Sequence, residues 1–122
     1  MMNASDMIEK VKQHPDFSKA GMVLCHNGVV RETSASGDRT VISLVVSADH
    51  EKLAGVIARH KQMPGIIEIL AEVADGRELF VGDDIMVLVV AGDVRTNVIP
   101  VMASLIDEVK ASVTSKTETY KE

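Results

Sequence analysis

The feature that most constrains this chain is a long apolar stripe of helical spacing near its C-terminal end. Apolar side chains recur three and four positions apart from Val98 to Val113, which is the spacing of one buried face of an α-helix. Thr96 is the expected N-cap, and this places Pro100 near the first turn, where a missing N–H costs little. Lys110 lies off the stripe, so we expect its ammonium group to reach solvent or a neighbouring loop.

Short segments rich in apolar and β-branched residues precede this helix and indicate strands. The expected elements are helices over residues 5–14 and 49–62 and strands over residues 20–26, 40–47, 66–74, 79–81 and 85–91. Turns as short as Pro64-Gly65 and Gly82-Asp83 join some of these segments, and such short connections favour antiparallel pairs. The predicted fold class is therefore α+β, with helices packed on a mixed, largely antiparallel sheet.

Composition indicates a single globular domain that covers residues 1–122. The chain has 122 residues, of which 46% are apolar and 25% charged, a profile typical of a soluble domain with its own core. An N-terminal helical segment occupies residues 1–17, and the polar tail over residues 114–122 is expected to be loose or ordered by a partner. No apolar run approaches the roughly 20 residues of a membrane span, so no membrane association is predicted.

We expect a cytoplasmic protein. The first ten residues lack the basic start and apolar core of a secretory signal. Cys25 is the only cysteine, so an intrachain disulfide is excluded and a reducing compartment is the simplest location. Because Cys25 lies inside an apolar strand, it is expected to be a small, unreactive core residue, and its neighbour His26 should face the opposite side of the strand.

The charge balance argues against a nucleic-acid surface. The chain carries 13 basic and 18 acidic residues, a formal net charge of −5, whereas nucleic-acid binding needs an excess of Lys and Arg. One Tyr and two Phe, without Trp, are too few for a base-stacking platform. The four histidines share no metal-ligand spacing, so neither a metal nor another cofactor is predicted. His60 falls on the apolar face of the second helix and is expected to pack there.

Four cationic residues are candidates for an anion site. Gly28 indicates a bulge or a close backbone approach after the first strand, and Arg31 could then hold a phosphate or carboxylate by two hydrogen bonds. Arg95 lies where a strand leads into the last helix, whose free N–H groups favour an anion. Lys110 and Lys116 flank the end of that helix. Each has a simpler interpretation as a solvated arginine or as a lysine that stabilises a helix end.

Four short segments match, in order, the motifs of a known family. The family pattern G-A-V-V-x-F-x-G-x-V-R is similar to residues 20–31 (AGMVLCHNGVVR), and G-E-L-x-x-G-D-E is similar to residues 77–84 (RELFVGDD). The motif I-D-x-L-K and the tail W-K-K-E or W-K-R-E are similar to residues 106–110 (IDEVK) and 116–118 (KTE). Over roughly residues 21–118 the chain thus resembles the large, catalytic subunit of molybdopterin synthase, the MoaE family.

The resemblance implies a fold, a reaction and partners. The implied fold is the α/β hammerhead-like fold of the family, in a homodimer. The implied partner is a small ubiquitin-like sulfur-carrier subunit, whose C-terminal thiocarboxylate passes sulfur to a cyclic pyranopterin phosphate to form molybdopterin. The chain would then be a sulfurtransferase of molybdenum cofactor biosynthesis. In that reaction Lys110 matches the family's catalytic lysine, Lys116 acts beside it, and Arg31 and Arg95 bind the substrate phosphate.

Two alternatives stay open. The order of elements over residues 41–109 also fits most of a ferredoxin-like sandwich, which would serve as a small-ligand regulatory or dimerisation module. The chain could also be a non-catalytic relative that keeps only the family's fold and partner surface. Two His-Arg pairs of the family are replaced here by Ala74-Asp75 and Val94-Arg95, and the tail has no Trp.

Overall fold

Two three-stranded antiparallel sheets and three α-helices make up residues 2–122, the part of the chain that this computed structural model describes. In chain order the elements are α1 (Ala4–Val11), the 3₁₀ turn η1 (Phe17–Lys19), β1 (Met22–Val29), β2 (Val41–Ala48), α2 (His50–Lys61), β3 (Ile66–Val73), β4 (Glu78–Phe80), β5 (Asp84–Gly92), α3 (Arg95–Glu108), the π-helical turn η2 (Val109–Val113) and β6 (Thr114–Tyr120). The α+β class predicted from the sequence is confirmed.

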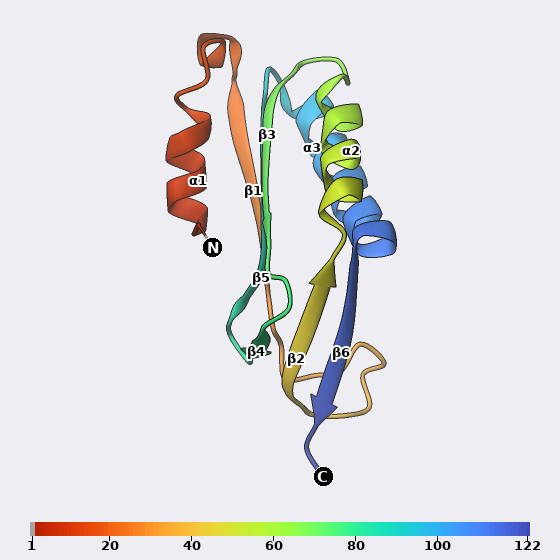
Figure 1. Ribbon diagram of the computed structural model, residues 1–122. Helices are drawn as coiled ribbons and strands as arrows, with labels where there is room; N and C mark the ends of the chain where they lie inside the picture. The colour runs from red at the N-terminus through yellow and green to blue at the C-terminus, as the bar shows by residue number, and fades with distance from the viewer. Residues whose placement is uncertain (1) are drawn as a thin grey trace.

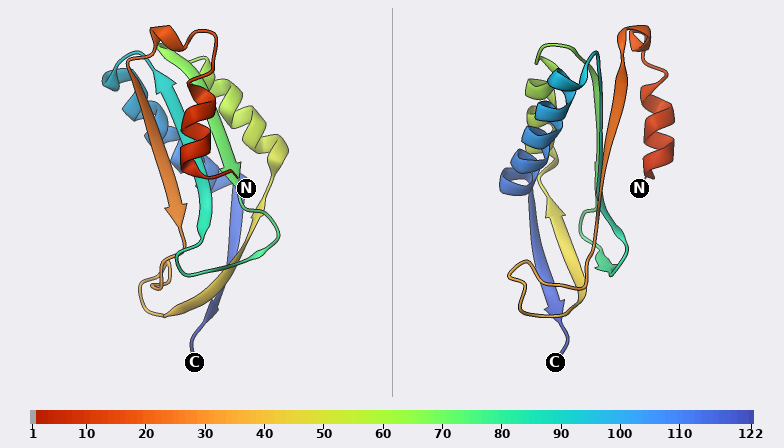
Figure 2. Two further views of the ribbon diagram at one scale, coloured as in Figure 1. Left: turned by 90° about the vertical axis from the view of Figure 1, so that its left-hand side faces the viewer. Right: turned by 180° about the vertical axis from the view of Figure 1, so that it is seen from behind.

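The first sheet has the strand order β1-β5-β3, with both outer strands antiparallel to the central β5. One face of this sheet is covered by α1, and the other by α2 and α3 (Figure 1; Figure 2). Val87 and Val89 of β5 pack on the side of α1, whereas Leu88 and Val90 pack on the side of α2 and α3. Because both faces of β5 are buried, its sequence is a continuous apolar run rather than an alternating one.

The second sheet has the order β4-β2-β6, again antiparallel. Its strands β2 and β6 run side by side beyond the ends of α2 and α3, with the C-terminus at the far end (Figure 1). The polar tail, expected to be loose or ordered by a partner, instead forms β6 and pairs along β2. Its polarity is explained by its position, since β6 is an edge strand with mostly exposed side chains.

The separation into two sheets excludes the ferredoxin-like alternative. In that sandwich the strands over residues 41–109 would share one sheet. Here β2 and β4 belong to one sheet and β3 and β5 to the other, so the turn at Gly82-Asp83 carries the chain between sheets rather than closing a hairpin.

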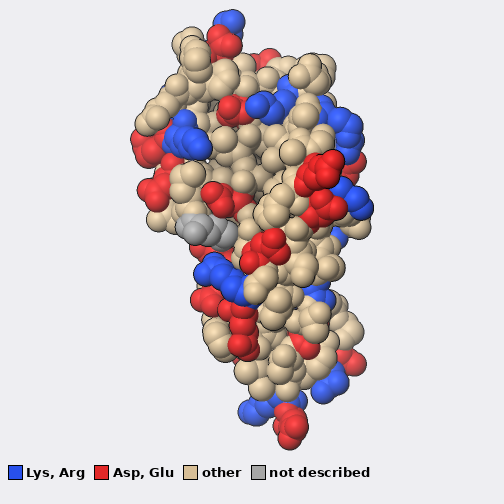
Figure 3. Space-filling view, viewed as in Figure 1, with Lys and Arg blue, Asp and Glu red and all other residues tan. Residues whose placement is uncertain are grey.

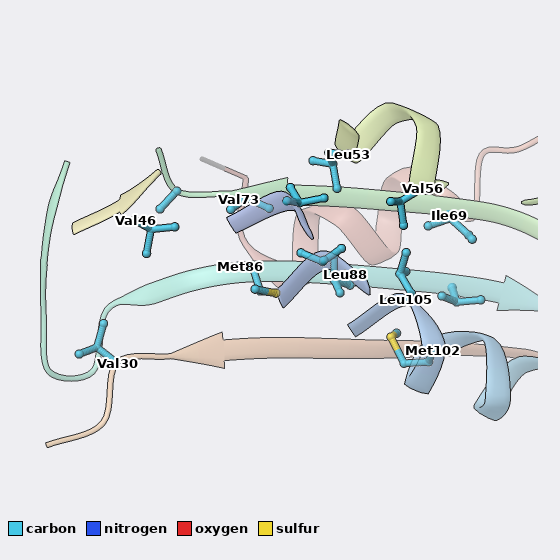
Figure 4. Close-up of a cluster of buried hydrophobic side chains, with 14 of the residues drawn as sticks. Val30, Val46, Leu53, Val56, Ile69, Val73, Met86, Leu88, Met102 and Leu105 are labelled. Atoms are coloured by element: carbon cyan, nitrogen blue, oxygen red, sulfur yellow. The ribbon is translucent and has the colours of Figure 1, made fainter. Parts of the chain in front are cut away.

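The main core lies between the first sheet and the layer of α2 and α3. Figure 4 shows Leu88 of β5, Val56 of α2 and Leu105 of α3 among the buried side chains that fill this space. His60 of α2 is fully buried in the same layer, as its position on the apolar face predicts. Its Nδ1 donates to the backbone oxygen of Val56 at 2.7 Å, and its Nε2 lies 3.0 Å from Oγ of Ser104 on α3.

The start of α3 differs from the prediction. Val94 is the N-cap instead of Thr96, so Pro100 falls in the second turn and not the first. Asp93 organises this end: its Oδ1 accepts from the backbone N–H of Val94 at 2.6 Å and from Nδ2 of Asn97 at 2.9 Å. The hydrogen bond from Asn97, followed by the one from Val94, holds the pKa of Asp93 below its usual value.

Candidate functional site

A cavity of about 650 Å³ opens between the ends of the two sheets, beneath η2. Its walls come from the end of β1 and the loop after it, from β2, from the start of β5, and from η2 and β6. Arg31, Lys110 and Lys116 all line it. Segments from distant parts of the sequence therefore bring three of the four predicted site residues to one place.

The local backbone explains how Arg31 reaches the cavity. Gly28 pairs with Met86 and Val29 pairs with Asp84, so the ladder between β1 and β5 skips Ile85. The sequence predicted a bulge or a close backbone approach at Gly28. The irregularity lies beside Gly28, but its extra residue, Ile85, belongs to β5, and bulges increase the local bend and twist of the paired strands. Arg31 follows directly, and its Nη2 donates to the backbone oxygen of Ser34 at 3.3 Å.

Lys110 lies on η2, a π-helical turn between α3 and β6. Val109 and Val113 of this turn are buried, so the turn continues the apolar stripe of α3 while Lys110 stays exposed. Such π-helical turns are rare in proteins, and those that occur often lie at functional sites. The chain then reverses into β6, where the strand's alternation puts Lys116 and Glu118 on the cavity side.

The three cationic groups are available to a ligand. Among the ion pairs of residues 2–122, none involves Arg31, Lys110 or Lys116. The one acidic residue that lines the cavity, Glu118, accepts a hydrogen bond from the hydroxyl of Tyr120 at 3.0 Å. Positive charge therefore exceeds negative charge at this cavity, which favours an anionic ligand.

His26 also lines the cavity and was missed as a site residue by the sequence analysis. It faces the layer of α2 and α3, whereas Cys25 lies half-buried against the small core under α1 that contains Val87 and Val89, and so it is less buried than the sequence predicted. The expectation that these two neighbours point to opposite sides is therefore confirmed. Burial raises the pKa of the Cys25 thiol, consistent with an unreactive side chain.

Arg95 does not share the cavity. It lines a separate shallow pocket with Gly21, Met22 and Asp93, at the opposite end of β1. Met22 beside this pocket and Gly28 beside the cavity are roughly 20 Å apart in an extended strand. Arg95 was predicted to join Arg31, Lys110 and Lys116 in one anion site. Within one chain it does not, because the helix that carries it begins at the far end of the first sheet.

Other kinds of site find no support in the described residues. Within residues 2–122 there is no group of three or more His, Cys, Asp and Glu side chains arranged to hold a metal ion. Lysine, arginine and acidic residues are interspersed over the face in Figure 3, which shows no continuous basic surface. No helix in this part of the chain is both long and apolar enough to cross a membrane.

The fold and the site together define an α+β protein with a cationic cavity between two sheets, suited to an anionic ligand. A family model described as "MoaE protein" matches residues 2–112. The chain therefore belongs to the MoaE family, a family of molybdenum cofactor biosynthesis, and the resemblance inferred from its sequence motifs is confirmed.

Solved structures share this fold. Molybdopterin synthase from Staphylococcus aureus superposes with a TM-score of 0.79 at 20% identity, over 99% of this chain and 87% of that one. The molybdopterin cofactor biosynthesis protein E of Burkholderia multivorans gives a TM-score of 0.76 at 19% identity, over 98% and 84% of the two chains. A complex of subunits 1 and 2 of the molybdopterin-converting factor from Helicobacter pylori gives 0.73 at 15% identity, over 96% and 78%. A search of curated proteins found no match.

Proposed function

We propose that this chain is the sulfur-transferring large subunit of a molybdopterin synthase. It would catalyse direct transfer of sulfur from the C-terminal thiocarboxylate of a small ubiquitin-like carrier to a cyclic pyranopterin phosphate. The thiocarboxylate sulfur bonds to the pterin, and water then cleaves the carrier's acyl–sulfur bond and leaves its C-terminus as a carboxylate. The observation that carries the proposal is the convergence of Arg31, Lys110 and Lys116 on one cavity, with none of them held in an ion pair within residues 2–122. Both the thiocarboxylate and the phosphate are anions, so the cavity suits both reactants.

Each cationic residue has a role that its chemistry supports. The planar guanidinium of Arg31 can bind two phosphate oxygens at once, which fixes the orientation of the substrate. Lys110, on the turn between α3 and β6, is the proton donor and acceptor beside the reacting sulfur. Lys116 lies on the cavity side of β6 and stabilises negative charge that develops during transfer.

Arg95 can join such a site only from a second copy of the chain. Its pocket lies at the far end of the first sheet, too distant for its side chain to reach the cavity of its own subunit. We therefore place Arg95 in the substrate site through the homodimer that the family resemblance implies. Within this proposal the protein acts in the cytoplasm, together with its carrier subunit.

The complex with a small subunit supports the choice of partner. The Helicobacter pylori structure, which shares the fold, contains subunits 1 and 2 of the molybdopterin-converting factor. We propose that this chain binds a carrier of the same kind, with the carrier's C-terminus inserted toward Lys110.

Reconstitution tests the proposal. The purified chain is mixed with a thiocarboxylated carrier and the cyclic pyranopterin phosphate, and molybdopterin is measured after conversion to a fluorescent derivative. The proposal expects product that depends on both the chain and the thiocarboxylate, with unmodified carrier as the matched control. Binding of the carrier without product would instead support the non-catalytic relative, in which Val94 stands where the family has His. Neither binding nor product would refute the assignment altogether.

A further inference from the structure

His26 lines the cavity and is not used by the proposed reaction. Its Nε2 is buried and has no hydrogen-bond partner among the described residues. Buried polar atoms are nearly always paired, so an unpaired one calls for an explanation. His26 also stands where the family pattern in residues 20–31 has Phe, so this polar atom is a feature of this chain rather than of the pattern.

The backbone beside His26 leaves room for its ring. A Cβ atom placed on Gly28 would lie 3.5 Å from Nε2 of His26 and 3.3 Å from Cγ of Met86. The imidazole and the Met86 side chain therefore both lie close to the bare backbone of Gly28. Because Met is unbranched and flexible, it can move aside and open Nε2 to a ligand in the cavity.

The charges around His26 favour its neutral form while the cavity is empty. Burial, and then the positive charge of Lys110, hold the pKa of His26 below its usual value. The other charged groups that line the cavity are Arg31, Lys116 and Glu118, so the net charge near the ring is positive. An added proton is thus unfavourable until an anion enters.

We propose that His26 is an anion-binding residue that takes up one proton from solvent when a doubly charged oxyanion fills the cavity. The protonated ring then donates Nε2–H to an oxygen of that anion, beside the charges of Arg31, Lys110 and Lys116. On release of the anion, the proton returns to solvent. The inference rests on the proposed function only in identifying the natural anion as the phosphate of the pterin substrate.

The test uses inorganic sulfate, which stays doubly charged over the range in which histidine titrates. Sulfate binding is followed by NMR between about pH 5 and pH 8, where Lys and Arg keep their charge. In the wild type, affinity rises as the pH falls, by up to about tenfold for each unit by which sulfate raises the pKa of His26. The His26 ring signal moves toward its protonated position when sulfate is added near neutral pH.

Two variants separate this role from a structural one. His26→Phe restores the residue of the family pattern, and His26→Gln keeps a hydrogen-bonding amide that does not titrate. Both should bind sulfate with an affinity that no longer rises at low pH, and an unchanged melting temperature shows that the fold is intact. Equal pH dependence in His26→Phe and wild type, or a His26 signal that sulfate does not move, overturns the proposal.

This readout is independent of sulfur transfer. Loss of molybdopterin formation with an intact sulfate response would reject the proposed reaction and keep the role of His26. Sulfur transfer with no sulfate response at His26 would reject the role of His26 and keep the reaction.

Discussion

Lys116 of β6 lies directly opposite Val46 of β2, and both residues line the cavity. The pairing fixes Lys116 through backbone hydrogen bonds of its own chain, so its position does not depend on a partner. The next inward-facing pair, Leu44 opposite Glu118, lines the cavity as well. One wall of the proposed site is therefore formed by the paired strands β2 and β6.

This pairing predicts that the C-terminal segment is ordered in the isolated protein. Backbone amides of residues 115–119 that pair with β2 should exchange with deuterium far more slowly than those of an unstructured peptide. Hydrogen exchange measured by NMR on the protein without carrier tests this. Glu122, beyond the strand, provides the internal control and should exchange fast, whereas random-coil exchange throughout 115–119 would contradict the pairing.

Substitution by alanine should lower the stability of the protein at one glycine and raise it at another. Gly65 has a φ of +78°, and a Cβ there would collide with the side chains of Asp93 and Asn97. Gly65→Ala should therefore lower the free energy of unfolding by about 1–3 kcal/mol. Gly55 lies in α2 with open space around it, so Gly55→Ala should raise stability by about 0.5–1 kcal/mol. Urea denaturation measures the change in the free energy of unfolding for each variant. A change in the same direction for both variants would be inconsistent with this structure.

His60 is predicted to hold α2 against α3 through its buried ring and its hydrogen bond to Ser104. His60→Ala removes a fully buried ring together with its contacts to Val56 and Ser104, so stability should fall by about 2–4 kcal/mol. Ser104→Ala removes a single hydrogen-bonding partner and should cost only about 1 kcal/mol. Chemical denaturation gives both values. A His60→Ala variant as stable as wild type would show that this contact does not stabilise the helix pair.

Much of the fold could be predicted because burial leaves a periodic signal. The apolar stripe of α3 shows that one face of this helix is buried, and the continuous apolar run of β5 shows that both faces of this strand are buried. By contrast, β6 has a polar sequence, and only its pairing with β2 makes it a strand. Propensity alone does not show such a tertiary effect.

The candidate site could be predicted only in part for a similar reason. Arg31, Lys110 and Lys116 were identified by residue type and by the family motifs, and the cavity confirms that they lie together. The position of Arg95 depends on where α3 begins relative to the first sheet, which the sequence does not reveal. His26 was missed because its proximity to Lys110 exists only once β1 and η2 have packed.

Cys25 should react slowly with thiol reagents in the native protein. Its side chain packs against the small core under α1, and burial raises the pKa of the thiol, so little thiolate is present near neutral pH. Labelling by a disulfide reagent should accelerate strongly when the protein is unfolded in denaturant. Equal rates in the two states would mean that the residue is accessible and that α1 does not protect it.

The central claim, that the cavity is the site of sulfur transfer, depends most directly on Lys110. In a single-turnover assay with thiocarboxylated carrier and cyclic pyranopterin phosphate, Lys110→Ala should slow molybdopterin formation by about 10²–10⁴-fold while the thermal melting temperature stays unchanged. Lys10→Ala, on α1 across the first sheet, is the matched control and should keep the wild-type rate. A wild-type protein without turnover, or a Lys110→Ala variant as fast as wild type, would contradict this account.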